Sequence, residues 1–171
     1  MKRLLIALLT LCAAPAVAQA QTNTAVGSVA STYAPVRAYV LAAAEQMPEA
    51  DYGFKPTPEV RSFGQLIGHI ANAQFMICSL ALGETSPATQ NYEQVTAKAA
   101  LIEALQASNA LCDRAYQQSD ESAMQTGRLF GQERTRLGML VLNAAHDFEH
   151  YGNIVTYMRL KGMVPPSSQG N

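Results

Sequence analysis

The sequence has no excess of basic residues. Its 171 residues include 12 Lys and Arg against 13 Asp and Glu, and charged residues make up only 15% of the chain. A surface that binds nucleic acid usually shows as a basic patch or stripe. We therefore expect no nucleic-acid partner.

After the N-terminal segment the sequence lacks long hydrophobic runs. No stretch there reaches the ~18 apolar residues of a transmembrane helix. The N-terminus itself has Lys2 and Arg3, a short apolar run over 4–11 and an Ala-x-Ala site ending at Ala20. This pattern predicts a secretory signal peptide over residues 1–20, with cleavage after Ala18 as the alternative. We expect an exported, periplasmic protein with one mature domain over residues 21–171 and no membrane association once the signal is removed.

Cysteine is scarce: three occur, and two of them, Cys78 and Cys112, lie in the mature chain. Both fall on neighbouring expected helices, and an exported protein folds where disulfides persist. We expect the two to be bridged; the alternative is two buried thiols, which behave as small apolar side chains.

The alternating β-branched pattern of strands is also scarce, and helical spacing predominates. We expect helices at about 32–47, 62–82, 92–118 and 133–161, with Pro35 in the first turn of the first and a loop at 119–131. Ser62 and Gln65 form a capping-box pattern at the start of the second helix, and Gly83 should end it. The fold class expected is all-α, an antiparallel four-helix bundle.

Only three histidines are present, and two of them, His146 and His150, lie four residues apart in the last expected helix. This spacing puts both rings on one face, as a shared metal ion requires. His69 lies midway along the second helix, where it is either a third ligand or a core histidine. Three neutral imidazoles would leave coordination positions open, as in catalytic sites.

Two further side chains are candidates for the chemistry. Glu149 projects about 60° from His146 around the helix, whereas Asp147 projects about 100° away. Glu149 is therefore the candidate catalytic base or hydrogen-bond acceptor, with a solvated acid as the alternative. Tyr157 is the second catalytic candidate, because it lies within about 60° of His146 around the same helix, on a face that is partly polar. The sequence over 146–150 also matches the inverted zinc-protease pattern H-x-x-E-H, but too little chain follows it for that family's domain.

The chain resembles the DinB-like metalloprotein family of four-helix bundles in four segments: 51–56, 62–69, 146–152 and 164–168. The resemblance implies a divalent ion, such as Zn, Ni or Fe, held by positions that match His69, His146 and His150. It also implies a homodimer in many relatives, and a thiol-dependent transferase or isomerase activity in some. Low-molecular-weight thiols are scarce outside the cytoplasm, which separates an exported chain from those relatives.

Three functions remain open from the sequence. The first is a metal-dependent enzyme, a transferase or hydrolase, that acts on a small molecule. The second is a non-catalytic periplasmic protein that binds a metal or ligand. The third is a stable bundle whose histidines belong to the core and hold no metal. Imidazole ligands suit several transition metals, so the ion is not specified.

Overall fold

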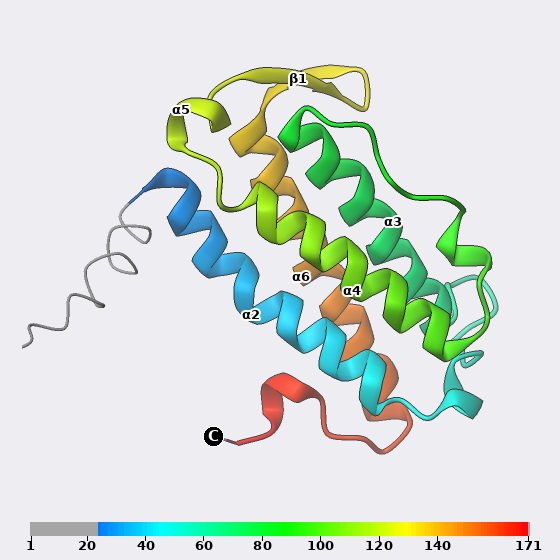
Figure 1. Cartoon of the computed structure of the whole chain (residues 1–171). Coiled ribbons are helices and arrows are strands. Elements are labelled where there is room, and N and C mark those ends of the chain that lie inside the picture. The colour runs from blue at the N-terminus through cyan, green and yellow to red at the C-terminus, as the bar shows by residue number, and fades with distance from the viewer. Residues whose placement is uncertain (1–23, 171) are drawn as a thin grey trace, which may run out of the picture.

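Four long helices form the molecule, and a small β-hairpin covers one end of them (Figure 1). The computed structural model describes residues 24–170, so the expected signal peptide over 1–20 lies outside the described residues. The long helices are α2 (Ala25–Gln46), α3 (Phe63–Leu82), α4 (Lys98–Ala115) and α6 (Arg136–Leu160). The expected all-α bundle is confirmed.

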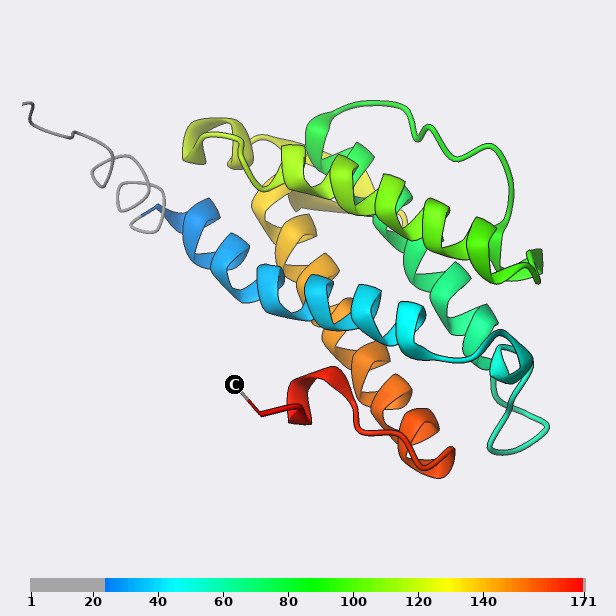
Figure 2. The same ribbon diagram turned by 60° about the horizontal axis from the view of Figure 1, so that its bottom comes forward.

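The second and third long helices run in the same direction. Gly64 faces Leu101 near their starts, and Cys78 is bonded to Cys112 near their ends. The segment over 83–97 therefore returns along the bundle before α4 begins, as Figures 1 and 2 show from two sides. It carries the short 3₁₀ helix η2 (Tyr92–Gln94). The other sequential pairs, α2 with α3 and α4 with α6, are antiparallel.

Helix α3 has the bounds that its sequence signals predict. The Ser62 hydroxyl accepts from the Gln65 backbone N–H, and the Gln65 side chain accepts from the Ser62 N–H, so the capping box is complete. Gly83 ends the helix with a left-handed φ of 75°, which glycine adopts without steric penalty. By length and composition α3 could cross a membrane, but 67% of its most apolar 18-residue window is buried, as suits the core helix of a bundle.

Helix α2 begins earlier than predicted, at Ala25 instead of residue 32, and Pro35 lies inside it. The first turn is held from a distance: both carboxylate oxygens of Asp120 accept backbone N–H groups, those of Ala25 and Val26, at 2.9 Å. Asp120 begins the short helix α5 (Asp120–Ala123). Thr24 also caps the helix locally, since its hydroxyl accepts from the Gly27 N–H at 2.9 Å. The contact with Asp120 joins positions 95 residues apart and therefore leaves no local pattern in the sequence.

The segment expected to be a loop over 119–131 contains regular structure. Strands β1 (Thr126–Leu129) and β2 (Gln132–Thr135) pair as an antiparallel hairpin, and α6 starts only after them. Helix α4 is likewise shorter than the predicted 92–118, because 92–94 form η2 and the irregular residues 95–97 separate it from Lys98. These expected bounds were wrong at the ends where turns interrupt the apolar pattern.

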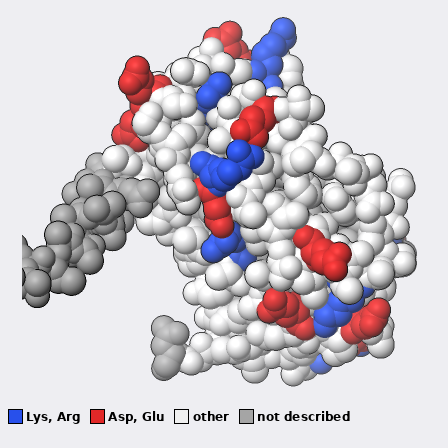
Figure 3. Space-filling view, in the orientation of Figure 1, with Lys and Arg blue, Asp and Glu red and all other residues white. Residues whose placement is uncertain are grey.

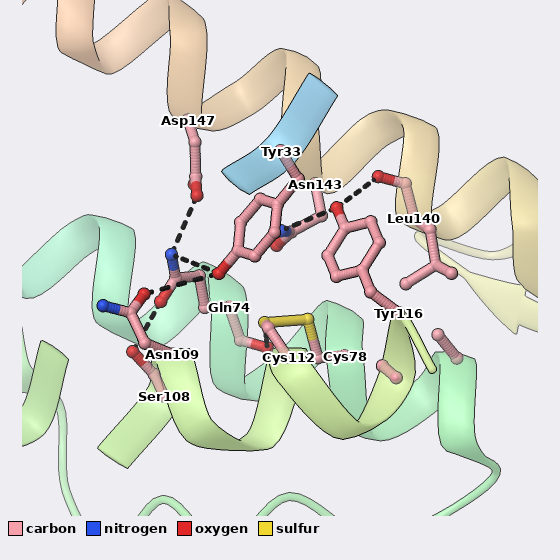
Figure 4. The surroundings of a disulfide bond; sticks show 12 residues. Tyr33, Gln74, Cys78, Ser108, Asn109, Cys112, Tyr116, Leu140, Asn143 and Asp147 are labelled. Carbon is pink, nitrogen blue, oxygen red and sulfur yellow. Dashed lines mark hydrogen bonds between the residues drawn. A yellow bond between two sulfur atoms is a disulfide. The ribbon is translucent and has the colours of Figure 1, made fainter. Parts of the chain in front are cut away.

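The predicted disulfide is present: Cys78 of α3 and Cys112 of α4 are bonded, with their Cα atoms 5.1 Å apart. Both residues are fully buried. Figure 4 shows the bridge beside a buried polar network that joins all four long helices. Within it, the amide of Gln74 donates to Asp147 at 2.8 Å and its oxygen accepts from the Ser108 hydroxyl at 2.6 Å.

Charged side chains are sparse on the surface. On the face in Figure 3, Lys and Arg lie among Asp and Glu and form no continuous basic stripe. The expected lack of a nucleic-acid partner stays a prediction.

Candidate metal centre

The three histidines meet between α3 and α6. The Nε2 atom of His146 lies 3.1 Å from Nε2 of His69 and 3.0 Å from Nε2 of His150. One nitrogen from each ring lies within 4.8 Å of those of the other two. The fold thus brings together the pair that spacing predicted and the His69 ring that it did not.

This arrangement fits a divalent cation. Nitrogens bound at ~2.0–2.1 Å to one ion lie about 2.9–3.4 Å from each other, for angles between octahedral and tetrahedral. The contacts that His146 makes to His69 and His150 fall within this range. The three rings could therefore hold one metal ion and leave at least one coordination position open.

The environment also favours the neutral imidazoles that bind metals. Burial, with the neighbouring His146 and His69 rings, lowers the pKa of His150 to about 4. Burial lowers the pKa of His69 too, although its hydrogen bond to Glu93 acts in the opposite direction. Protons therefore compete weakly with a cation at neutral pH.

A carboxylate that the sequence reasoning missed orients His69. The Oε1 atom of Glu93, in η2, lies 2.7 Å from His69 Nδ1, and its Oε2 atom accepts from Arg61 Nε at 2.9 Å. Burial alone would raise the pKa of Glu93, but the hydrogen bonds from Arg61 and His69 lower it, so the carboxylate is ionised. A carboxylate on Nδ1 places the proton there and leaves the Nε2 lone pair for a metal.

His146 faces a second carboxylate, that of Asp147. Their Nδ1 and Oδ1 atoms lie 3.7 Å apart, and within residues 24–170 neither atom has a hydrogen-bond partner although both are buried. Gln74 holds the other oxygen of Asp147. The helical-wheel angle had favoured Glu149 over Asp147 as the acid beside the histidines, but the structure buries Asp147 and exposes Glu149.

Two further polar side chains of α6, Asn153 and the predicted Tyr157, are held by different partners. The side-chain nitrogen of Asn153 is 3.5 Å from Nδ1 of His150. The Tyr157 hydroxyl is taken up by the backbone, since it donates to the Arg61 carbonyl at 2.6 Å. Catalytic roles for Glu149 and Tyr157 stay predictions.

A cavity of about 300 Å³ opens beside His69 and His146. Its apolar lining comes from α3, α6 and the tip of the hairpin. These residues are Ala73, Met76, Ile77, Phe130 and Leu142. A small molecule in this cavity would have direct access to the histidine nitrogens.

Comparisons with known proteins agree with this architecture. The family model of the DinB superfamily matches residues 33–154. A DinB-like protein from Bacillus cereus has a similar structure, with a TM-score of 0.71 and 16% identity over 81% of this chain and 93% of that one. A DinB-like protein from Bacillus subtilis has a TM-score of 0.62 and 21% identity over 80% and 93%. No curated protein matches the sequence.

These identities are low enough that the two structures support the fold alone. The family match spans most of the four long helices and includes all three histidines. The chain belongs to the DinB superfamily.

Proposed function

We propose that this protein is a metal-dependent enzyme of the periplasm that acts on a small molecule. The observation that carries the proposal is the convergence of three imidazole nitrogens at the wall of a cavity. A site that served only structure would be closed by a fourth protein ligand, whereas catalytic sites keep a position open. A bound divalent ion would supply Lewis-acid polarisation of a substrate or activation of water or a thiolate.

The protein's own residues would prepare this site. Glu93 fixes the orientation of the His69 ring through its Nδ1 atom, and Asp147 lies 3.7 Å from Nδ1 of His146. Burial lowers the pKa of His69 and His150. Glu149 is exposed on the same helix as His146 and His150, where it can exchange protons with solvent. We assign it the role of general base, with Tyr157 lining the site, for a transferase or hydrolase reaction.

Elemental analysis of the purified full chain tests the metal site. We expect about one equivalent of Zn, Ni or Fe per chain, and its loss in His69→Ala, His146→Ala and His150→Ala while helical circular dichroism is retained. Glu149→Gln is the matched control, because it should keep the ion and lose activity. Stoichiometric metal in His146→Ala would contradict the site assignment.

The alternative function is non-catalytic binding of a metal or ligand. It predicts that all coordination positions are filled by the protein. Azide added to the Co(II)-loaded protein discriminates the two, because a new ligand changes the visible spectrum only where a position is exchangeable. An unchanged spectrum at saturating azide would favour the binding protein.

Export and self-association complete the proposal. The Cys78–Cys112 disulfide supports an oxidising compartment, and mass spectrometry of the mature N-terminus tests for removal of residues 1–20. Val141 and Phe148, seven residues apart on α6, are 48% and 43% exposed, which supports an apolar contact with a second copy. Light scattering should then give twice the chain mass, and Val141→Glu should halve it.

A further inference from the structure

The polar side chains around the cavity are already engaged by the protein. Asn72 donates to Asn91 Oδ1 at 2.7 Å and accepts from the Tyr92 N–H at 3.0 Å. Glu93 uses one oxygen for His69 and the other for Arg61. A ligand in the cavity therefore finds its polar partner at the histidine end, and apolar side chains elsewhere.

Phe130 lies over this cavity although both its exposure and its backbone conformation are unfavourable for a phenylalanine. Its side chain is 70% exposed, although large apolar side chains are normally buried. Its φ is 51°, in the left-handed region that disfavours bulky residues. With Gly131 it forms the two-residue turn of the hairpin, where Asn-Gly or Gly-Gly would be free of this strain.

Neither packing of the bundle nor the turn itself accounts for an aromatic ring at this position. The ring does line the cavity beside the histidines, together with Met76 and Leu142. Strained residues are retained where the strained position serves a site. A ligand bound in the cavity would cover the exposed ring of Phe130 and remove its apolar surface from water.

We propose that the cavity binds a small apolar molecule, preferably aromatic, that carries a single anionic donor group. The donor lies at the three histidines, and the apolar body packs between Phe130 and the wall formed by α3 and α6. The volume is at the lower end of the ~300–1,000 Å³ found for small-molecule sites, which limits the ligand to one ring or a short chain. This inference rests on the proposed function, because the donor binds through the metal ion.

Two hydroxamates that share one donor group test the preference. Acetohydroxamate and benzohydroxamate are titrated into the full chain loaded with Co(II), and binding is followed by the visible spectrum. We expect benzohydroxamate to bind about tenfold more tightly or better, because its ring is removed from water in the cavity. Equal affinities would overturn the proposal while leaving the metal site intact. A wild-type chain that binds no Co(II) would instead overturn the proposed function, and this inference with it.

Phe130→Gly tests the role of the aromatic ring, and it should fold because glycine suits the turn. We expect its benzohydroxamate affinity to fall about fivefold or more, with acetohydroxamate and Co(II) affinities unchanged. The matched control is Met124→Ala, which removes a large exposed apolar side chain that is not part of the cavity lining. It should keep the full preference for benzohydroxamate.

Light scattering of the Phe130→Gly chain separates a ligand contact from a contact between subunits. An unchanged mass with reduced selectivity supports the proposal. A dimer that dissociates in this variant while the preference for benzohydroxamate is retained would make Phe130 an interface residue and overturn it.

Discussion

The backbone of Gly68 lies directly against the backbone of Tyr92, so closely that a Cβ atom at position 68 would overlap the Tyr92 carbonyl group. This contact presses η2 onto α3 one residue before His69. Glu93, the next residue of η2, can then reach His69 Nδ1 at 2.7 Å. A glycine in a helix, usually a weakness, here positions a carboxylate beside a candidate metal ligand.

Gly68→Ala should therefore lower both stability and metal affinity. The new methyl group meets backbone atoms, which must shift, and such overpacking destabilises by about 1–3 kcal/mol. Urea unfolding and a competitive Zn titration measure the two effects. The control is Gly152→Ala in α6, where a Cβ meets nothing within 4 Å and helix propensity should add about 0.5–1 kcal/mol. Equal effects from both substitutions would contradict the positioning role of Gly68.

Glu93→Gln tests the carboxylate itself. The amide keeps the shape of the side chain but not the charge that holds the Nδ1 proton, and loss of such a partner typically weakens metal binding 10–100-fold. Isothermal titration with Zn measures the affinity. Glu103→Gln, an exposed acid on α4, should leave it unchanged. A Glu93→Gln chain with wild-type affinity would show that the ion pair with Arg61 is only structural.

Local signals explain which parts of the fold and site the sequence could predict. The bounds of α3 follow from Ser62, Gln65 and Gly83, each within reach of the backbone it caps. The pairing of His146 with His150 follows from one turn of helix. By contrast, Glu93 approaches His69 from a turn 24 residues away, and nothing in its neighbourhood marks it as a partner.

The predictions that were wrong or incomplete concern features without such local signals. The hairpin turn carries Phe130 where sequence rules expect Asn or Gly, so the strands on either side were predicted as a loop. At the early start of α2, the local cap from Thr24 acts together with Asp120, which is distant in the chain. The role of His69 came from the family resemblance, because only packing of α3 against α6 brings it to the other two rings.

The disulfide should contribute measurably to stability. Its cysteines are 34 residues apart, and a loop of that length restricts the unfolded chain by about 4 kcal/mol in the chain-entropy model. Urea unfolding of a Cys78→Ala/Cys112→Ala chain should show a loss of this order, in part from the two small voids. The wild-type chain unfolded with a reductant should show a similar loss. No difference between oxidised and reduced chains would mean that the unfolded state is already restricted.

Asp120 should make stability depend on pH in the acid range. The backbone hydrogen bonds from Val26 and Ala25 lower the pKa of its carboxyl group in the folded state. A lowered folded pKa means that the stabilisation is complete above the unfolded value of ~3.9 and is lost as pH falls through the folded value. Thermal melts between pH 2 and 7 should show a shallower acid decline for Asp120→Asn than for wild type. Glu121→Gln, an exposed neighbour, should retain the wild-type profile.

Asp147 and Glu149 offer a final comparison, because they flank the same helix turn and differ in burial. The Oδ1 atom of Asp147 lies 3.7 Å from His146 Nδ1, and within residues 24–170 neither of these two buried atoms has a hydrogen-bond partner, so each is the nearest polar group that the other can turn to. Asp147→Asn should therefore weaken Zn binding by about tenfold or more, whereas Glu149→Gln should leave it intact. Both affinities are measured under conditions where circular dichroism shows a fully folded chain. If Glu149→Gln weakened the metal affinity as much as Asp147→Asn, the exposed acid and not the buried one would be the partner of the histidines, as the helical wheel had suggested.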